Sequence, residues 1–130
     1  MSDKKQIVIK KQDVESNLTR LLQSNEGIYA ALLSSVDGHA LAKQSSRDFS
    51  DSRLAAMTSS CLALGEKMAL EAQQAGCNFV IIQNQDGFMV LRRVGDKLVI
   101  STMATKNVNL GLVLSATNVV AEELEKAIQN

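Results

Sequence analysis

The 130-residue sequence has no proline and no tryptophan, and its aromatic side chains are one tyrosine and three phenylalanines. So few rings leave little with which to stack nucleic-acid bases or flat cofactors. Neither sign of charge is in excess, since 14 basic residues balance 14 acidic ones. A nucleic-acid-binding domain usually carries a basic stripe, whereas the lysine cluster here (Lys4, Lys5, Lys10 and Lys11) lies at the N-terminus and is typical of a solvated tail. We therefore expect no nucleic-acid partner.

Residues for metal binding and catalysis are equally scarce. His39 is the single histidine, and the two cysteines, Cys61 and Cys77, form no CxxC pair, so we expect no metal site. The sequence contains no GxSxG, GxxxxGK[ST] or GxGxxG motif, which removes the nucleophile elbow and the common phosphate-binding loops. We predict no catalytic residue and no cofactor. The cysteines are predicted to be small buried hydrophobes, separated by roughly 20 Å of helix at about 1.5 Å per residue.

The sequence also lacks an apolar run long enough to cross a bilayer, and its N-terminus lacks the apolar core of a signal peptide. We expect a soluble cytoplasmic protein without direct membrane insertion. Its length suits one domain over residues 12–130 after a tail of residues 1–11. Within the tail, Ile7, Val8 and Ile9 are β-prone. This trio is open to three interpretations: part of an unstructured tail, an added edge strand, or a strand exchanged with a partner.

Hydrophobic periodicity predicts a mixed domain with the element order α-β-β-α-β-β-β-α. Gly27 is placed to end the first helix in a left-handed conformation, and Asp37-Gly38 favours a two-residue hairpin turn. Strand 28–36 is apolar on both faces, as in the interior of a covered sheet, whereas strand 39–44 is polar enough for an edge. The full set of expected helices is 12–24, 51–76 and 108–128, and that of strands is 28–36, 39–44, 78–83, 88–94 and 97–104.

The middle helix carries more apolar surface than one sheet face requires. A broad arc comprises Leu54, Met57, Cys61, Leu62, Leu64, Gly65, Met68, Ala69 and Ala72. A narrow second ridge at heptad spacing lies opposite the arc and comprises Ala56, Ala63 and Leu70. A helix that only covers its own sheet needs one apolar face. The surplus indicates that this helix also meets another chain.

Four segments carry a resemblance to a known family. They are GIYAALLSSVDGHALA at 27–42, SRLAAMTSSCLALGEKM at 52–68, FVIIQNQDGFMVLRRVGDKLVISTMA at 79–104 and NVNLGLVL at 107–114. In these segments and in element order the sequence resembles the Roadblock/dynein light-chain family, particularly its bacterial MglB-type members. The element Ser35-Val36-Asp37-Gly38 is only moderately specific alone, and its combination with the element order is much more specific.

The resemblance implies an α+β, profilin-like fold: a five-stranded antiparallel sheet in the order 2-1-5-4-3, sandwiched between the middle helix and the terminal helices. Members of the family dimerise by pairing their third strands and packing their second helices side by side. For this chain the resemblance implies a homodimer interface of Met57, Cys61, Leu62, Leu64, Met68, Ala69, Phe79, Val80, Ile81 and Ile82. The side of the arc that meets the partner helix is left open between Leu62 with Ala69 and Met57 with Leu64 and Met68.

Such dimers serve as platforms for small Ras-like GTPases, and MglB-type members activate or co-activate their GTPase without being enzymes themselves. The candidate docking strip, unless it is an ordinary solvent face, is Arg53, Ala56, Ser60, Ala63, Lys67, Leu70 and Glu71. An arginine finger from Arg53 is not supported by the resemblance. One alternative function is a PAS- or profilin-like sensory module with a small ligand between helix and sheet, which the shortage of aromatic and buried polar residues argues against. Another is a non-catalytic subunit of a cytoskeletal or motor complex.

Overall fold

Five antiparallel strands form one sheet in the order β2-β1-β5-β4-β3, as the resemblance implied. The computed structural model describes residues 10–128, so the Ile7–Ile9 trio lies outside the described residues. The elements are α1 (Lys11–Gln23), β1 (Ile28–Ser35), β2 (Ala40–Ser45), α2 (Asp51–Glu71), β3 (Phe79–Asn84), β4 (Gly87–Val94), β5 (Leu98–Thr105) and α3 (Leu110–Ile128). Helix α1 starts at Lys11, one residue before the predicted start at residue 12.

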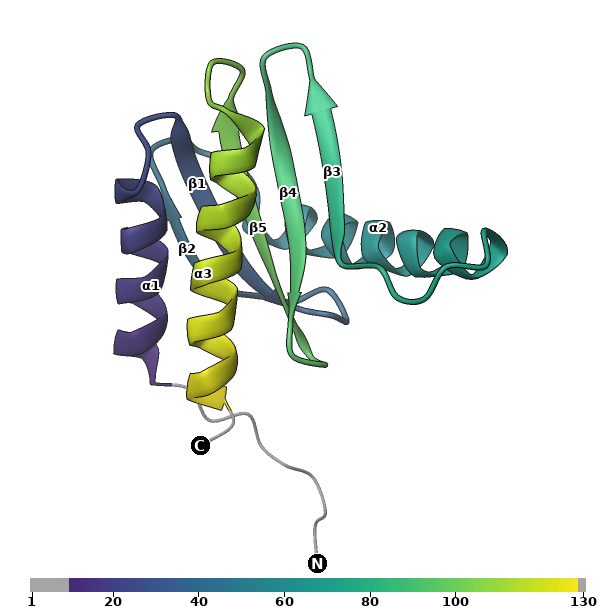
Figure 1. The fold of residues 1–130 in the computed structure, drawn as a ribbon. Coiled ribbons are helices and arrows are strands. Elements are labelled where there is room, and N and C mark those ends of the chain that lie inside the picture. The colour runs from purple at the N-terminus through teal and green to yellow at the C-terminus, as the bar shows by residue number, and fades with distance from the viewer. Residues whose placement is uncertain (1–9, 129–130) are drawn as a thin grey trace, which may run out of the picture.

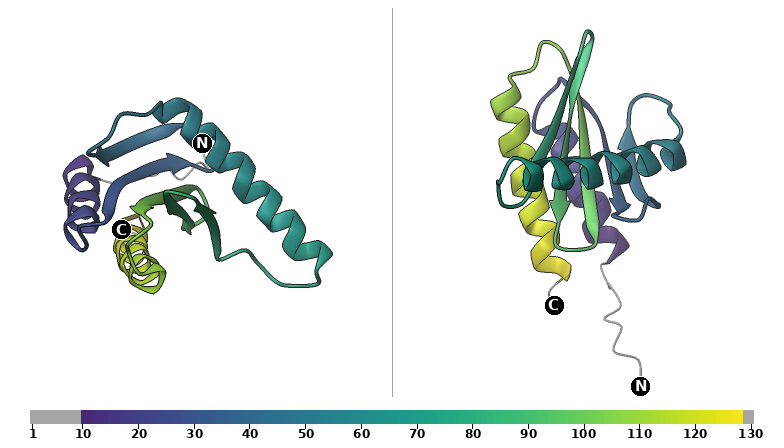
Figure 2. Two further views of the ribbon diagram at one scale, coloured as in Figure 1. Left: turned by 90° about the horizontal axis from the view of Figure 1, so that it is seen from above. Right: turned by 90° about the vertical axis from the view of Figure 1, so that its right-hand side faces the viewer.

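The helices cover the two faces of the sheet unequally. α1 and α3 lie side by side over one face, and α2 crosses the other face (Figures 1 and 2). α2 runs across the strands and continues past β3, so its C-terminal part extends beyond the edge of the sheet (Figure 1). The segment 72–78 then returns from the end of the helix to β3.

The core is correspondingly asymmetric. On the α2 side the cluster of buried apolar residues is small and comprises Ala30, Leu32, Ala55 and Met103, and Leu62 of α2 is also buried. Between the sheet and the other two helices the buried cluster is much larger: Val14, Leu18, Leu21, Ile28, Ala31, Leu33, Phe88, Val90, Val94, Leu98, Ile100, Ala104, Val113, Val120, Ala121 and Leu124. Hydrophobic burial therefore stabilises the α1 and α3 layer far more than the α2 layer.

The face of α2 that packs on the sheet is turned away from the centre of the predicted arc. Its buried residues are Ala55, Thr58 and Leu62, spaced at helical intervals on one side of the helix. Met57 and Leu64, which belong to the predicted arc, are exposed. The sequence pattern could not separate the two sides because small residues, Ala55 and Thr58, make the sheet contact.

The first strand contains a register shift, and the turn after it differs from the prediction. A register shift between Ile28 and Ala30 places Ile28 in the larger core cluster and Ala30 under α2, so the two residues do not share a face. The prediction of a two-residue turn at Asp37-Gly38 is wrong, because β1 ends at Ser35 and β2 begins only at Ala40. The N–H of Ser35 donates to the His39 carbonyl at 2.8 Å, which closes a wider loop.

Helix α2 ends at Glu71 rather than at the predicted residue 76. The N–H of Gln74 donates to the Ala69 carbonyl at 2.8 Å, and the N–H of Gln73 donates to the Leu70 carbonyl at 3.0 Å. Gln73 has φ 60°. These bonds form a Schellman cap in which glutamine takes the left-handed position that glycine normally holds. Helix propensity is high through this segment, so the sequence carries no local stop signal before Gly76.

Gly27 does not take the predicted left-handed conformation, since the positive-φ glycines of the described residues are Gly38, Gly76 and Gly95. A Cβ on Gly27 would instead lie 1.6 Å from Val108 Cγ2. Glycine is needed here for close packing against the segment that leads into α3.

The cysteine prediction is wrong on both counts. Both thiols are half-buried, and the chain reverses after α2, so Cys77 returns alongside the helix. The Cys77 Sγ lies 3.0 Å from the place that a Cβ on Gly65 would take, and Cys61 is one helical turn before Gly65. The distance along a continuous helix therefore does not describe their separation.

Arg92 and Arg93 alternate to opposite faces of the sheet, as strand geometry requires. Arg92 Nη1 lies 2.8 Å from Glu125 Oε1 on α3, and Arg93 Nε lies 3.4 Å from Glu66 Oε1 on α2. Each arginine therefore joins β4 to the helix on its side of the sheet.

Candidate protein interaction site

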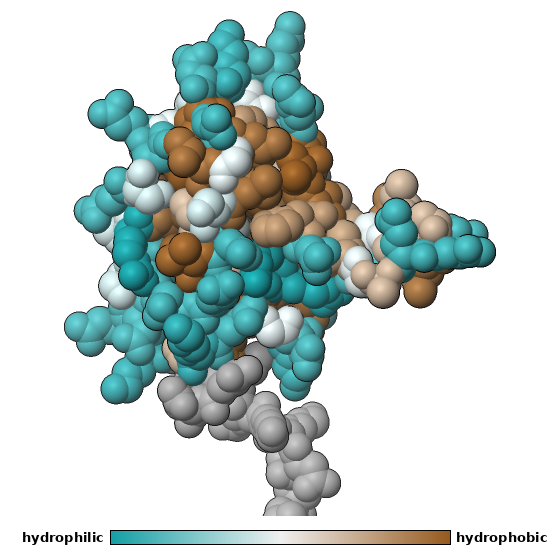
Figure 3. Space-filling model, viewed as in Figure 1, coloured by the Kyte–Doolittle hydropathy of each residue, from teal (hydrophilic) through white to brown (hydrophobic). Residues whose placement is uncertain are grey.

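The exposed apolar band of α2 is the most conspicuous surface feature of the helix. Met57 is 63%, Leu64 58% and Met68 62% exposed. The three residues lie on one side of the helix, and Leu64 and Met68 border a depression together with Lys67, Glu71 and Ala72. The projecting end of α2 stands clear of the body of the molecule in Figure 3. Large apolar side chains grouped on a surface in this way mark an interaction site.

The β3 edge lies next to this band. β3 pairs with β4 along residues 79–84, and no strand of residues 10–128 pairs with its other side. Its first four side chains, those of residues 79–82, are apolar, and Ile81 is 43% exposed. An edge of this kind is a template for pairing with another strand unless charges, proline or a covering segment protect it.

The band and the edge form one continuous surface. A Cβ on Gly65 would lie 3.3 Å from Val80 Cγ2, so α2 passes directly over β3 at this glycine. An isolated glycine within a helical pattern often marks close packing, and this was the sequence signal for the contact.

The structure distributes the ten predicted interface residues over three environments. The exposed ones are Met57, Leu64, Met68 and Ile81, and the half-buried ones are Cys61, Ala69, Phe79, Val80 and Ile82. Leu62 is only 2% exposed because it packs on the sheet of its own chain. Leu62 is therefore not available to a partner, and the side of the arc with Met57, Leu64 and Met68 is the free one.

All seven residues of the predicted docking strip lie on the exposed side of α2: Arg53, Ala56, Ser60, Ala63, Lys67, Leu70 and Glu71. The loop between β1 and β2 borders the start of this strip. A Cβ on Gly38 would lie 3.5 Å from Ala56 Cα, and the Ser59 hydroxyl donates to the Val36 carbonyl. The strip thus continues from the helix onto the loop.

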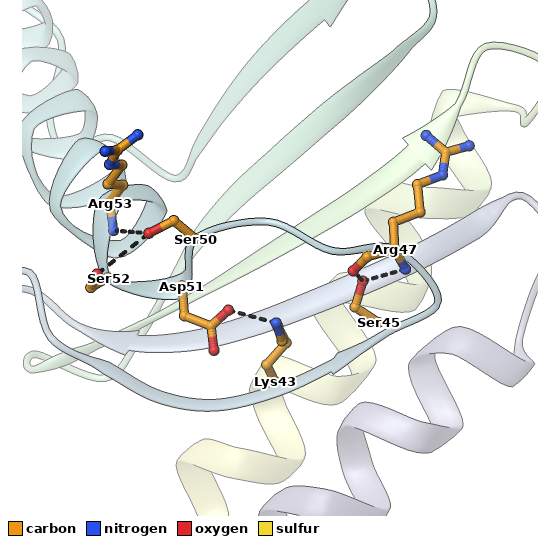
Figure 4. A network of polar contacts seen from close by, with 7 residues as sticks. All are labelled: Lys43, Ser45, Arg47, Ser50, Asp51, Ser52 and Arg53. Carbon is orange, nitrogen blue, oxygen red and sulfur yellow. Dashed lines mark hydrogen bonds and ion pairs between the residues drawn. The ribbon is translucent and has the colours of Figure 1, made fainter.

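Polar contacts hold the start of α2 on the sheet (Figure 4). The Ser50 hydroxyl accepts from the Arg53 N–H at 3.3 Å, which caps the helix. Lys43 Nζ on β2 lies 2.6 Å from Asp51 Oδ1 in the first turn. The Arg53 guanidinium points away from this pair (Figure 4). These contacts fix the N-terminal half of α2, where the sheet supports it.

Asp37, in the loop beside the strip, is negatively charged at neutral pH. Its pKa lies below the ordinary value because the Ser35 hydroxyl hydrogen-bonds to its carboxylate, with smaller contributions from its own backbone N–H and from His39. The His39 N–H donates to Ser35 Oγ at 3.0 Å. The loop therefore presents a fixed acidic group next to the helix.

Sequence reasoning missed the junction at Glu66. This side chain accepts from the Cys77 N–H at 3.3 Å and pairs with Arg93 at 3.4 Å. It therefore ties α2 to the returning segment and to β4 at the point where the helix leaves the sheet. The contact joins residues far apart in sequence, so no local pattern could have revealed it.

The rest of the described surface offers little that is typical of catalysis. No group of three or more His, Cys, Asp and Glu side chains in residues 10–128 is arranged to hold a metal ion. Within the same residues, no helix combines the length and the hydropathy needed to cross a membrane. A groove of about 750 Å³ opens between α1 and the ends of β1 and β2, which is a position between a helix and the sheet, as in the small-ligand alternative.

The comparison with known families decides the identity of the fold. A family model for the Roadblock/LC7 domain matches residues 15–104. The chain belongs to the Roadblock/LC7 domain family. No protein of curated function matches this Roadblock/LC7 chain in sequence.

Solved structures extend the likeness over nearly the whole Roadblock/LC7 chain. Myxococcus xanthus MglB is 16% identical with a TM-score of 0.85, and the match covers 92% of this chain and 98% of MglB. The gliding protein MglB of Thermus thermophilus is 15% identical with a TM-score of 0.85, covering 98% of each chain. A Roadblock/LC7 domain of Streptomyces avermitilis is 14% identical with a TM-score of 0.82, covering 88% of this chain and 97% of that domain. At such identities the likeness establishes the fold.

Proposed function

We propose that this chain forms a homodimer through α2 and β3, and that the dimer is a platform for a small Ras-like GTPase. The observation that carries the first part is the overhang of α2, whose C-terminal part continues past the β3 edge (Figure 1). The exposed Leu64 and Met68 flank Gly65, the residue at which the helix contacts β3. A second copy related by a two-fold axis would bring its own β3 edge and α2 band to this place. Such an interface is self-complementary by symmetry.

The second part rests on the docking strip and on the family. The strip combines the strongly exposed Leu70, 73% exposed, with charges of both signs from Arg53, Lys67 and Glu71. Apolar contacts with charges around them are the usual composition of a protein interface. The strip and the dimer band are neighbours on the exposed face of α2, because Lys67 and Glu71 of the strip border the same depression as Leu64 and Met68 of the band.

The platform acts by choosing between conformations of its partner. It binds the GTP-loaded conformer more tightly than the GDP-loaded one, and this differential affinity shifts the switch regions of the GTPase toward a hydrolytic arrangement. The chain supplies no catalytic residue of its own. The hydrolytic groups belong to the GTPase.

The test of the platform is a binding measurement with a purified Ras-like GTPase from the same organism, loaded with a GTP analogue or with GDP. We expect tighter binding of the GTP form, and we expect Lys67→Glu to weaken it roughly tenfold or more by placing like charges or an unpaired charge in the interface. Lys106→Glu is the matched control, since Lys106 is an exposed lysine away from α2. Equal affinity for both nucleotide states, unchanged by Lys67→Glu, would contradict the platform while leaving the dimer intact.

Arg53 provides a separate check on the absence of catalytic groups. An arginine finger typically raises GTP hydrolysis by about 10³–10⁵-fold. We expect Arg53→Ala to change binding and stimulated turnover together, because Arg53 acts only through docking. A loss of stimulated turnover with unchanged binding would instead identify Arg53 as a finger.

A further inference from the structure

The C-terminal end of α2 has few contacts with its own chain. Leu62 is the last buried residue of the helix, and the helix continues past the edge of the sheet (Figures 1 and 2). Its last polar anchor is Glu66, which accepts from the Cys77 N–H and pairs with Arg93. Within the described part of the chain, no side chain of residues 67–71 forms a hydrogen bond or an ion pair. From residue 67 onward the helix therefore has little support from its own sheet.

The last turn of α2 is also poorly stabilised as a helix. It ends on the acidic Glu71 and contains no basic residue, although the C-terminus of a helix favours cations. Lys67 lies four residues before Glu71, and in this order the pair stabilises a helix less than in the reverse order. The cap holds Gln73 at φ 60°, which is unfavourable for a residue with a side chain. Because short helical segments without tertiary contacts are marginal in water, this end needs packing from outside its own chain.

The same end carries both parts of the proposed interaction site. Leu64, Met68 and Leu70 are exposed, and the first two belong to the band that a second copy would cover. Lys67 and Glu71 of the docking strip border the depression that Leu64 and Met68 line. The dimer contact and the C-terminal part of the docking strip therefore share one segment of helix.

We propose that the second copy folds the end of α2, so that the C-terminal part of the docking strip, Lys67, Leu70 and Glu71, is stably helical only in the dimer. This inference rests on the dimer and the platform proposed above. In a single copy the helix opens locally from residue 67 onward, while its supported part stays folded. Dimerisation and GTPase binding both favour the folded end, so each raises the affinity of the other. The GTPase thus recognises a pair of chains.

The folding step is tested by hydrogen–deuterium exchange on the native chain at concentrations above and below dissociation of the dimer, with the mass measured in the same samples. We expect the amides of residues 68–74 to lose roughly tenfold or more of their protection as the dimer dissociates, because local opening then breaks no contact with a partner. The amides of α3 are the internal control and should change by less than about twofold, since α3 covers the larger core.

The coupling to docking is tested with a monomeric variant altered away from α2. Ile81→Lys places a charge on the β3 edge, which opposes strand pairing, and Ile81 lines a depression with Leu110 of α3. Val119→Lys is the matched control, since Val119 on α3 is 52% exposed against 43% for Ile81. We expect only Ile81→Lys to have the mass of one chain and to bind the GTP-loaded GTPase roughly tenfold or more weakly.

A rescue separates folding of the helix end from direct contact between the GTPase and the second copy. Adding Gln73→Gly to Ile81→Lys relieves the left-handed position after α2. We expect it to recover up to about fivefold in GTPase affinity, while the mass stays that of one chain. Gln74→Gly in the same background is the matched control and should recover nothing.

The outcomes that overturn the inference differ from those that overturn the proposed function. A dimer whose residues 68–74 exchange equally fast after dissociation would refute folding by the second copy and leave the dimer in place. Equally tight GTPase binding by the native chain and Ile81→Lys would refute the coupling and leave the platform in place. A native chain that is monomeric at every concentration, or that binds no GTPase, would overturn the proposed function and the inference with it.

Discussion

At the residue scale, Gly87 shows how little room the β4–β5 pair leaves. A Cβ on Gly87 would lie 2.1 Å from the carbonyl oxygen of Ala104, and this backbone atom belongs to the strand ladder and has little freedom to move. We expect Gly87→Ala to lower the free energy of unfolding by about 1–3 kcal/mol, the usual cost of overpacking, as measured by urea denaturation. Gly111→Ala, at an exposed position in the first turn of α3, is the control and should change stability by less than about 1 kcal/mol. Equal losses in the two variants would contradict the packing argument.

Also at this scale, two buried threonines join the sheet to α3. Thr117 Oγ1 donates to Thr102 Oγ1 at 2.9 Å, and neither residue has exposed surface. Thr117→Val leaves the Thr102 hydroxyl without this donor, so we expect a loss of about 1–3 kcal/mol in unfolding free energy. The double variant Thr102→Val with Thr117→Val removes both partners and should lose less than the sum of the single changes. A double-mutant cycle with strictly additive losses would show that the pair is not coupled.

At the scale of single elements, the end of α2 offers a stabilising change. Gln73 holds φ 60° in a Schellman cap, where a side chain costs roughly 1 kcal/mol relative to glycine. We expect Gln73→Gly to raise the free energy of unfolding by up to about 1 kcal/mol in thermal or urea denaturation. Gln74→Gly is the matched control, because Gln74 is also exposed and its φ is not positive. If both variants were destabilised alike, the left-handed cap would not limit stability.

Helix α2 also shows which features of the fold the sequence did not predict. Every helix and strand was expected in its place, because apolar periodicity depends on neighbouring residues and is readable locally. The end of α2 at Glu71 was not expected, since Gln73 stands at the position where a C-terminal helix cap usually has glycine. The rotation of α2 on the sheet was also missed, because the helix contacts the sheet through Ala55 and Thr58 while larger apolar residues remain exposed. Tertiary packing decided both features.

At the scale of the whole molecule, the sheet has one thickly covered face and one thinly covered face. The sequence predicted the surplus apolar surface of the middle helix, but it did not predict which side of that helix stays exposed. Leu62, a predicted interface residue, is buried in the core of its own chain. The junction of Glu66 with Arg93 and Cys77 depends on the reversal of the chain after α2, which no local pattern predicts. These contacts place the apolar band beside the β3 edge, so the candidate interface is a product of the fold.

The most direct test of the dimer is the mass of the chain in solution, measured by light scattering across a range of concentrations. We expect the native chain to have about twice the single-chain mass of 14.1 kDa, and Leu64→Asp to reduce it to the mass of one chain, because a buried unpaired carboxylate opposes association. Leu112→Asp is the matched control, since Leu112 on α3 is 57% exposed against 58% for Leu64, and it should remain dimeric. A native chain with the mass of a single copy at every concentration, or an equal response of the two variants, would contradict the account.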